Sequence, residues 1–163
     1  MHTIRVLSKH FFTERRRMMT KDLREWSRHV AASADATDAL MATLEGFGAI
    51  VERIKSRAAN QLEYSAKFPA GETTVTVKII MLDSQTDSDI VIANITVLPE
   101  ADTGKGYGGE AIRRILAWAG QRRMNEVRAT QVGNPQARKF WEKNGFLLAP
   151  EPNPCKDLVH RLL

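Results

Sequence analysis

Residues 102–119 read DTGKGYGGEAIRRILAWA, a cluster of glycines followed by a helical pattern. Gly104, Gly106, Gly108 and Gly109 fall within six residues and run directly into apolar positions at helical spacing. Glycine costs roughly 0.5 to 1 kcal/mol relative to alanine in regular structure, so such a cluster marks backbone that turns tightly or approaches a ligand closely. Consecutive N–H groups at the positive end of a helix are typical of a phosphate site.

Two other phosphate-binding motifs fit this stretch poorly. Gly104, Gly106 and Gly109 match the dinucleotide pattern G-x-G-x-x-G, which requires the first glycine directly after a strand and an acidic residue at the far end of the next strand. Here Pro99 and its neighbours intervene, and the next strand carries Glu126 at the wrong end. A nucleotide P-loop is excluded because no Gly-Lys-Ser/Thr ends the stretch. A loop that cradles a pyrophosphate is the interpretation that is left.

The surrounding segments alternate between strand and helix patterns. We expect the glycine loop to lead into a helix with apolar positions at Ala111, Ile112, Ile115, Leu116 and Ala119. We expect the other helices over about 19–31, 33–60 and 134–145, the second weakened by Gly46 and Gly48. Asn134, followed by Pro135, should be the N-cap of the third. The expected strands are 3–8, 61–68, 72–82, 90–99, 125–132, 146–150 and 156–163, and in the fourth Val91, Ala93, Ile95 and Val97 should share a face.

The composition bounds the class of protein. At 163 residues, 43% hydrophobic and 26% charged, the chain is predicted to form a single domain over residues 1–163. No long apolar run or signal-peptide pattern occurs, so we expect a cytoplasmic protein with no membrane partner. Cys155 is the single cysteine in the chain, so no metal site is predicted. A net charge of +5 and a pI near 9.6 favour acidic partners.

Two blocks of the sequence carry a family resemblance. The segment VLPEADTGKGYGGEAIRRILAWA (97–119) resembles the acyl-coenzyme A loop of the GNAT superfamily of N-acyltransferases, with Thr103, Gly106 and Gly108 at its marked positions. The segment NPQARKFWEKNGF resembles the next helix of the family, where the coinciding residues are Asn134, Ala137, Phe140, Gly145 and Phe146. Thr103 replaces the usual Arg or Gln, the loop after Pro99 is one residue longer, and Trp141 stands where tyrosine is common.

The resemblance implies a fold and a reaction. The fold is α/β, a GNAT-like three-layer fold with a mixed central sheet that splays between its fourth and fifth strands. The implied activity is transfer of an acetyl group from acetyl-CoA, the cosubstrate, to a primary amine. The resemblance assigns cofactor binding to Ile95, Val97, Thr103, Gly104, Lys105, Gly106, Tyr107, Gly108, Gly109, Asn134, Ala137 and Trp141. No catalytic acid or base is assigned; Asn94 and Thr96 are expected to order a water.

The acceptor stays open at this stage. It can be a protein, a small molecule or an amine on charged tRNA, and the basic run that includes Arg16, Arg24 and Arg28 would steer an acidic acceptor. An alternative is a non-catalytic acyl-CoA-binding or nucleic-acid-binding module on the same scaffold. The sequence does not give the acyl chain length, the pathway or the oligomeric state, for which a homodimer is one option.

Overall fold

The computed structural model describes residues 34–56, 61–82, 89–130 and 132–162. The chain divides into two units, residues 1–36 and 37–163, and the first is described only at 34–36, which are helical. The predicted strand 3–8 and the predicted basic helix 19–31 lie outside the described residues. The prediction of a single domain stays a prediction, and the following account concerns the second unit.

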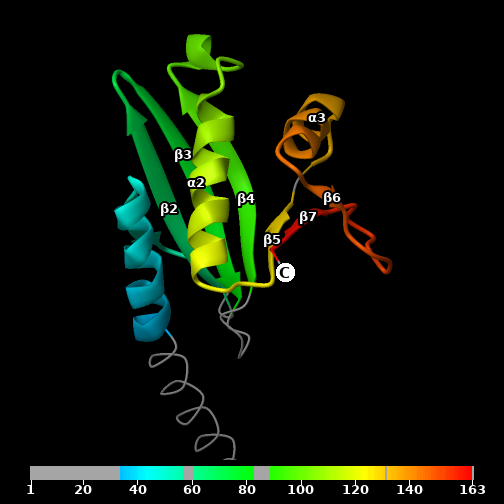
Figure 1. The fold of residues 1–163 in the computed structure, drawn as a ribbon, viewed down its shortest axis with the longest axis horizontal. Coiled ribbons are helices and arrows are strands. Elements are labelled where there is room, and N and C mark those ends of the chain that lie inside the picture. Colours follow the sequence, from blue (N-terminus) through cyan, green and yellow to red (C-terminus); the bar gives the residue numbers. More distant parts are fainter. Residues whose placement is uncertain (1–33, 57–60, 83–88, 131, 163) are drawn as a thin grey trace, which may run out of the picture. The chain divides into compact units, whose positions relative to one another are not determined.

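In the described part of this unit, seven strands form one mixed sheet (Figure 1). Their order across the sheet is β1-β2-β3-β4-β5-β7-β6. β4 and β5 run parallel, and every other neighbouring pair is antiparallel. The strands are β1 (Ile50–Ile54), β2 (Gln61–Ala70), β3 (Thr73–Leu82), β4 (Asp89–Leu98), β5 (Glu126–Ala129), β6 (Leu147–Leu148) and β7 (Leu158–Arg161).

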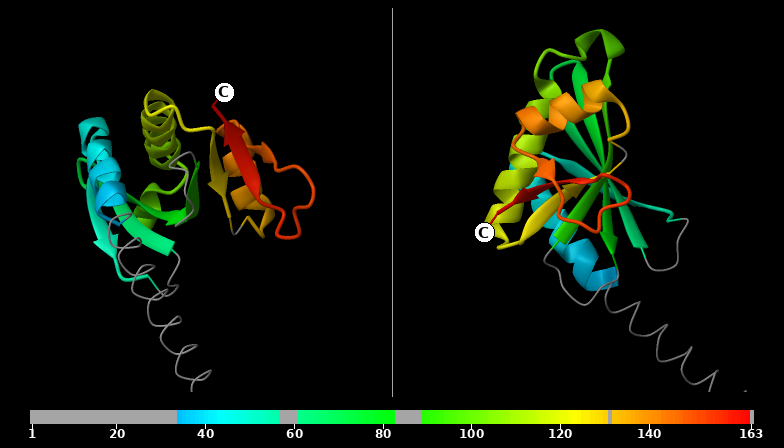
Figure 2. Two further views of the ribbon diagram at one scale, coloured as in Figure 1. Left: turned by 90° about the horizontal axis from the view of Figure 1, so that it is seen from below. Right: turned by 90° about the vertical axis from the view of Figure 1, so that its right-hand side faces the viewer.

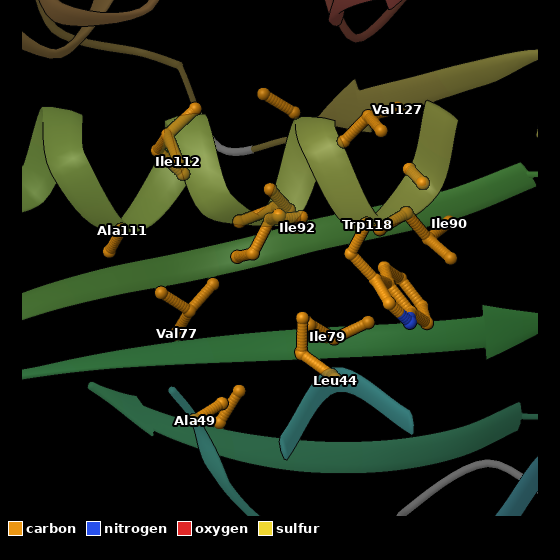
Figure 3. Packing of buried hydrophobic residues seen from close by; sticks show 14 of the residues in the cluster. Leu44, Ala49, Val77, Ile79, Ile90, Ile92, Ala111, Ile112, Trp118 and Val127 are labelled. Carbon is orange, nitrogen blue, oxygen red and sulfur yellow. The ribbon is translucent and has the colours of Figure 1, made fainter. Parts of the chain in front are cut away.

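Helices follow the parts of the sequence with 3.6-residue periodicity. They are α2 (Tyr107–Gln121), α3 (Pro135–Lys143) and, in this unit, a helical segment over residues 37–47 that ends in the 3-10 turn η1 (Thr43–Phe47). A second short 3-10 turn is η2 (Glu100–Asp102). Ile112, Ile115 and Trp118 recur on one face of α2 and are fully buried in the core that also holds side chains of β3 and β4 (Figure 3). The Trp118 indole N–H donates to Thr43 Oγ1 at 2.9 Å, so η1 is joined to α2. Figure 2 shows α2 and the helical segment ending in η1 beside the same part of the sheet.

The predicted helix 33–60 is wrong in its second part. Gly48, with φ 87°, follows η1, and residues 50–54 form β1, which pairs with β2 from Ile50–Lys67 to Ile54–Glu63. Val51 and Ile54 continue the helical spacing of the preceding apolar residues but are half-buried on a strand. A residue in the left-handed conformation ends a helix, and glycine adopts it without a Cβ penalty. Gly48 is therefore the boundary of the helical segment, whereas Gly46 lies within η1.

β4 has two neighbours along its first part and one along its second. It pairs with β5 only from Asp89–Glu126 to Ile92–Ala129, followed by a single bond from the Thr130 N–H to the Ile92 carbonyl at 3.1 Å. Residues 93–98 run beside β3 but, within the described ranges, have no partner in β5 (Figure 1). We call 89–92 the paired half and 93–98 the open half. The predicted splay between the fourth and fifth strands is confirmed.

A β-bulge separates the two halves of β4. The register shifts between Lys78 and Ile79 of β3, which face Asn94 and Ile92, so Ala93 is the extra residue. Ile90 and Ile92 face the core, whereas beyond the bulge the odd-numbered Ile95 and Val97 do so. The prediction that Val91, Ala93, Ile95 and Val97 share a face is therefore wrong, because one inserted residue shifts the alternation.

Candidate functional site

A cavity of about 780 Å³ lies beside the open half of β4. Its size is within the range of ligand sites in proteins. Three segments line it: the open half, the loop that leads into α2, and one face of α3. The lining residues are Ile95, Thr96, Val97, Leu98, Glu100, Thr103, Gly104, Gly106, Gly108, Gly109, Asn134, Gln136, Ala137, Phe140, Trp141, Lys143 and Asn144.

The cavity collects the predicted site residues apart from Lys105 and Tyr107. Lys105 is exposed, and its ammonium donates to Asp102 Oδ1 at 2.6 Å. Tyr107 is half-buried against the hydrophobic core. The structure thus brings the segments 97–119 and 134–146 together around one cavity. The side chains of Lys105 and Tyr107 lie outside the lining because the first is bonded to Asp102 and the second packs against the core.

The first turn of α2 presents backbone N–H groups without a side-chain cap. Its N-cap residue, Gly106, has φ 95° and no side chain to bond to the first turn. The first N–H groups of a helix, here those of Tyr107, Gly108 and Gly109, have no intrahelical carbonyl to bond to, and they carry the positive end of the helix dipole. A Cβ on Gly106 would meet nothing within 4 Å. This end of the cavity can therefore hold an anionic group.

Gly108 has a different role from Gly106. A Cβ on Gly108 would lie 3.3 Å from Phe140 Cε2 and 3.5 Å from Ile95 Cδ1. The missing side chain lets α2 approach both α3 and β4 closely. A bulky substitution there would separate the walls of the cavity, rather than block only an anion at the helix start.

Asp102 fixes the loop between β4 and α2. The Thr73 hydroxyl, at the start of β3, donates to Asp102 Oδ2 at 2.5 Å, and Lys105 donates to Oδ1. The hydrogen bond from Lys105, followed by that from Thr73, holds the pKa of the Asp102 carboxyl below its ordinary value. Sequence analysis did not single out Asp102, and its only local signal is the i, i+3 spacing from Lys105.

The start of α3 forms part of the opposite wall. Asn134 Oδ1 accepts the Ala137 N–H at 2.7 Å, and Pro135 occupies the first helical turn, so the predicted N-cap is confirmed. The lining residues Phe140 and Asn144 were not predicted as site residues. They lie three and seven residues beyond Ala137, positions that share one face of a helix with it, so the helical spacing would have predicted them.

Trp141 is packed in the wall rather than projecting freely. It is 4% exposed, and its ring lies 5.1 Å from that of Phe140 and 4.8 Å from that of Phe146, edge to face. At the end of α3 the Phe146 N–H donates to the Trp141 carbonyl, and the Gly145 N–H donates to that of Glu142. This is a Schellman motif, which brings the residues at its two ends into contact. Among the described residues the indole N–H has no hydrogen-bond partner.

The open half of β4 has a backbone N–H outside the ladder with β3. Ile95 lies opposite Val77, yet its N–H donates to Asn94 Oδ1 at 2.9 Å. Asn94 and Thr96 are exposed, on the face opposite the core. Among the lining residues, Glu100 is the one carboxylate and Lys143 the one cation.

The described ranges contain neither a metal-binding cluster nor a membrane-spanning helix. They hold no group of three or more histidine, cysteine, aspartate or glutamate side chains placed to bind a metal ion. None of the helices found in those ranges has the length and apolar character needed to span a membrane.

Comparison with known proteins gives a family match and several similar structures. The model of the acetyltransferase (GNAT) family matches residues 8–146. A Bacillus subtilis acetyltransferase in complex with CoA is 15% identical, over 71% of this chain and 99% of that chain, with a TM-score of 0.45. The Vibrio cholerae spermidine/spermine N-acetyltransferase SpeG is 15% identical, over 65% and 69%, with a TM-score of 0.45. Among curated proteins no sequence matches significantly.

Proposed function

The chain belongs to the GNAT family of acetyltransferases, and from this premise we propose that it transfers an acetyl group from acetyl-CoA to a primary amine. Acetyl-CoA is the cosubstrate typical of the family. The observation that carries the proposal is the cavity, which joins the uncapped start of α2 to the open half of β4. A helix start suited to an anion and the edge of a strand thus border one continuous space, which supports the proposal.

The residues of the cavity fit the parts of coenzyme A. In this proposal the backbone N–H groups of residues 106–109 bind the pyrophosphate, as helix starts do for phosphates generally. Thr103 supplies no positive charge, so the amides carry most of this binding, and Lys143 is the one cation among the lining residues. The pantetheine arm would lie along Ile95 and Val97, between β4 and α3.

The proposed transfer asks little acid–base chemistry of the protein. The amine nitrogen forms a bond to the acyl carbon, and the carbon–sulfur bond of the thioester breaks. The amine loses one proton, and the departing CoA thiolate takes up one proton from solvent. An N–H of β4 would polarise the acyl carbonyl. Trp141 cannot protonate the thiolate, because an indole N–H does not titrate in the useful range. A thiol with a reference pKa near 8.5 leaves without a dedicated acid.

A second function has one observation in its favour. Trp141 replaces the tyrosine common in the family, and the lining holds Glu100 as its one carboxylate, so an acid–base pair is lacking among the lining residues. This arrangement would suit a protein that binds acyl-CoA without turning it over. The acceptor of the transferase, whether protein, small molecule or charged tRNA, belongs to the same set of open proposals.

Calorimetry and turnover separate these functions. We expect CoA and acetyl-CoA to bind in calorimetry. We also expect the release of CoA thiol when the protein is incubated with acetyl-CoA and each of a set of amines that includes polyamines, peptides and aminoacyl-tRNA. Binding without release on any amine would favour the binding module. Absence of binding would overturn both functions.

A matched pair of glycine substitutions locates the binding site. Gly106 and Gly120 both leave open space for a Cβ, but only Gly106 has a positive φ and lies at the start of α2. Gly106→Ala should strain the loop by about 1–3 kcal/mol and lower CoA affinity about tenfold or more. Gly120→Ala should leave the affinity unchanged. Equal affinities in the two variants would place the phosphates elsewhere.

A further inference from the structure

The hydrogen bond between Ile95 and Asn94 marks a backbone donor that faces the gap in the sheet. Opposite residues of an antiparallel pair alternate between hydrogen-bonded and non-hydrogen-bonded positions. The Ile92 carbonyl accepts the Thr130 N–H from the β5 side, so the pair of Ile92 with Ile79 is a non-hydrogen-bonded one. The pair of Asn94 with Lys78 comes next, after the extra residue, and it is followed by Ile95 opposite Val77, where the Ile95 N–H donates to Asn94 Oδ1. The pair with Val77 is therefore a non-hydrogen-bonded one. The Ile95 N–H points to the side of β4 where β5 has ended.

The acceptor of this hydrogen bond is a carbonyl oxygen on a movable side chain. Asn94 is exposed, and its neighbour Ile95 lines the cavity. An exposed strand N–H is ordinarily satisfied by water, so the carboxamide is not needed to avoid a buried unpaired donor. Its oxygen has the same hydrogen-bonding character as the carbonyl of an acyl group.

We propose that Asn94 is a positioning residue whose side-chain oxygen holds the Ile95 N–H until the thioester carbonyl of acetyl-CoA takes its place. The inference rests on the proposed function. The inference adds that Asn94 Oδ1 competes with the acyl carbonyl for the Ile95 N–H, the donor that would polarise the acyl group. The carboxamide keeps that donor aligned, and binding of the acetyl group must first break the Asn94 hydrogen bond.

Comparison of CoA with acetyl-CoA isolates this competition, because the two ligands differ only in the acetyl group. Asn94→Ala removes the competing oxygen, so the ratio of acetyl-CoA affinity to CoA affinity should rise about three- to tenfold, the worth of one net hydrogen bond. Asn94→Asp keeps the oxygen and adds charge, which strengthens the competing bond, so the same ratio should fall below that of the parent. Both ratios come from calorimetry.

Thr76→Ala is the matched control. Thr76 lies on the same face of the sheet, opposite Thr96, but outside the cavity lining. Its loss should leave the affinity ratio unchanged. Any effect of altering the polar face in general would appear in this variant as well.

The amide resonance of Ile95 gives a second readout that does not depend on turnover. Hydrogen-bonded amide protons resonate downfield, so in Asn94→Ala without ligand the Ile95 signal should move upfield of its position in the parent. Acetyl-CoA should move it downfield again, and CoA should not. An unchanged ratio in Asn94→Ala, or an equal change for both ligands, would overturn the inference alone. Failure of the parent to bind either ligand would overturn the proposed function and this inference together.

Discussion

The two halves of β4 share a strand and a neighbour but have different surroundings. Ile90 and Ile92, in the paired half, are fully buried, with β3 on one side and β5 on the other. In the open half Ile95 and Val97 are half-buried, while Asn94 and Thr96 are exposed. The difference arises because β5 ends at Ala129. The paired half joins β3 to β5, whereas the open half leaves its peptide groups on the β5 side without a strand partner among the described residues.

The largest expected effect is a loss of stability, compared between one substitution in the paired half of β4 and one in the open half. Ile92→Ala should lower the free energy of unfolding by about 2–5 kcal/mol, because it empties a fully buried site. Ile95→Ala removes a half-buried side chain from the cavity wall, so it should cost less stability and weaken CoA binding more. Urea unfolding and calorimetry of both variants check this. If the two lost equal stability, the halves would not differ as we describe.

Gly108→Val tests how closely α2 packs against the open half of β4. Its side chain would press on Phe140 and Ile95, and such overpacking costs about 1–3 kcal/mol. Thermal unfolding should show this loss, and calorimetry should show weaker CoA binding. Gly120→Val is the control, since it lies in the same helix with nothing within 4 Å. A similar loss in both variants would assign the effect to helix propensity and not to the contact.

Asp102 connects the loop after the open half to β3, the only strand that the open half pairs with among the described residues. Asp102→Asn should weaken the bond from Lys105 and lower CoA affinity about three- to tenfold, the effect of losing one net hydrogen bond at an exposed site. Thr73→Val, which removes the other donor, should act in the same direction. Unchanged affinity in both variants would show that the loop keeps its conformation without Asp102.

The pH dependence of this anchor follows from the lowered pKa of Asp102. A carboxyl whose folded pKa lies below its unfolded pKa stabilises the fold above the unfolded value and loses that contribution as the pH falls through the folded value. The hydrogen bonds of Asp102 should therefore persist below the usual aspartate pKa of about 3.9. A carboxyl-carbon NMR titration measures the midpoint. A midpoint above that value would contradict the two hydrogen bonds.

The smallest expected effect on turnover and CoA affinity comes from substitutions of Trp141 in α3, the wall of the cavity opposite the open half of β4. Trp141→Phe keeps an aromatic ring against Phe146 and removes an N–H that has no partner among the described residues. We expect turnover and CoA affinity to change less than about threefold, and the same for Trp141→Tyr. A large loss of rate in Trp141→Phe with unaltered CoA affinity would instead make the indole N–H part of the chemistry.

Local patterns in the sequence were enough to predict α2, α3 and the β2–β3 hairpin. Their signals, helical spacing, the Asn134 cap and strand alternation, lie within the elements themselves. β1 was missed because Val51 and Ile54 happen to continue a helical period across Gly48. The bulge was missed because Val91 and Ala93 are apolar too, so the alternation reads smoothly through it. The Asp102 anchor depends on Thr73, which only the folded chain brings near.

The bulge at Ala93 also determines how insertions and deletions act on this chain. Deleting Ala93 would restore a regular ladder with β3, because Asn94 would then follow Ile92 directly and stay opposite Lys78, so Ile95 and Val97 would still face the core. A one-residue deletion there would therefore remove the bulge and keep the residues of the open half on their present faces. In aligning this chain with a relative whose strand is regular, the gap belongs at Ala93.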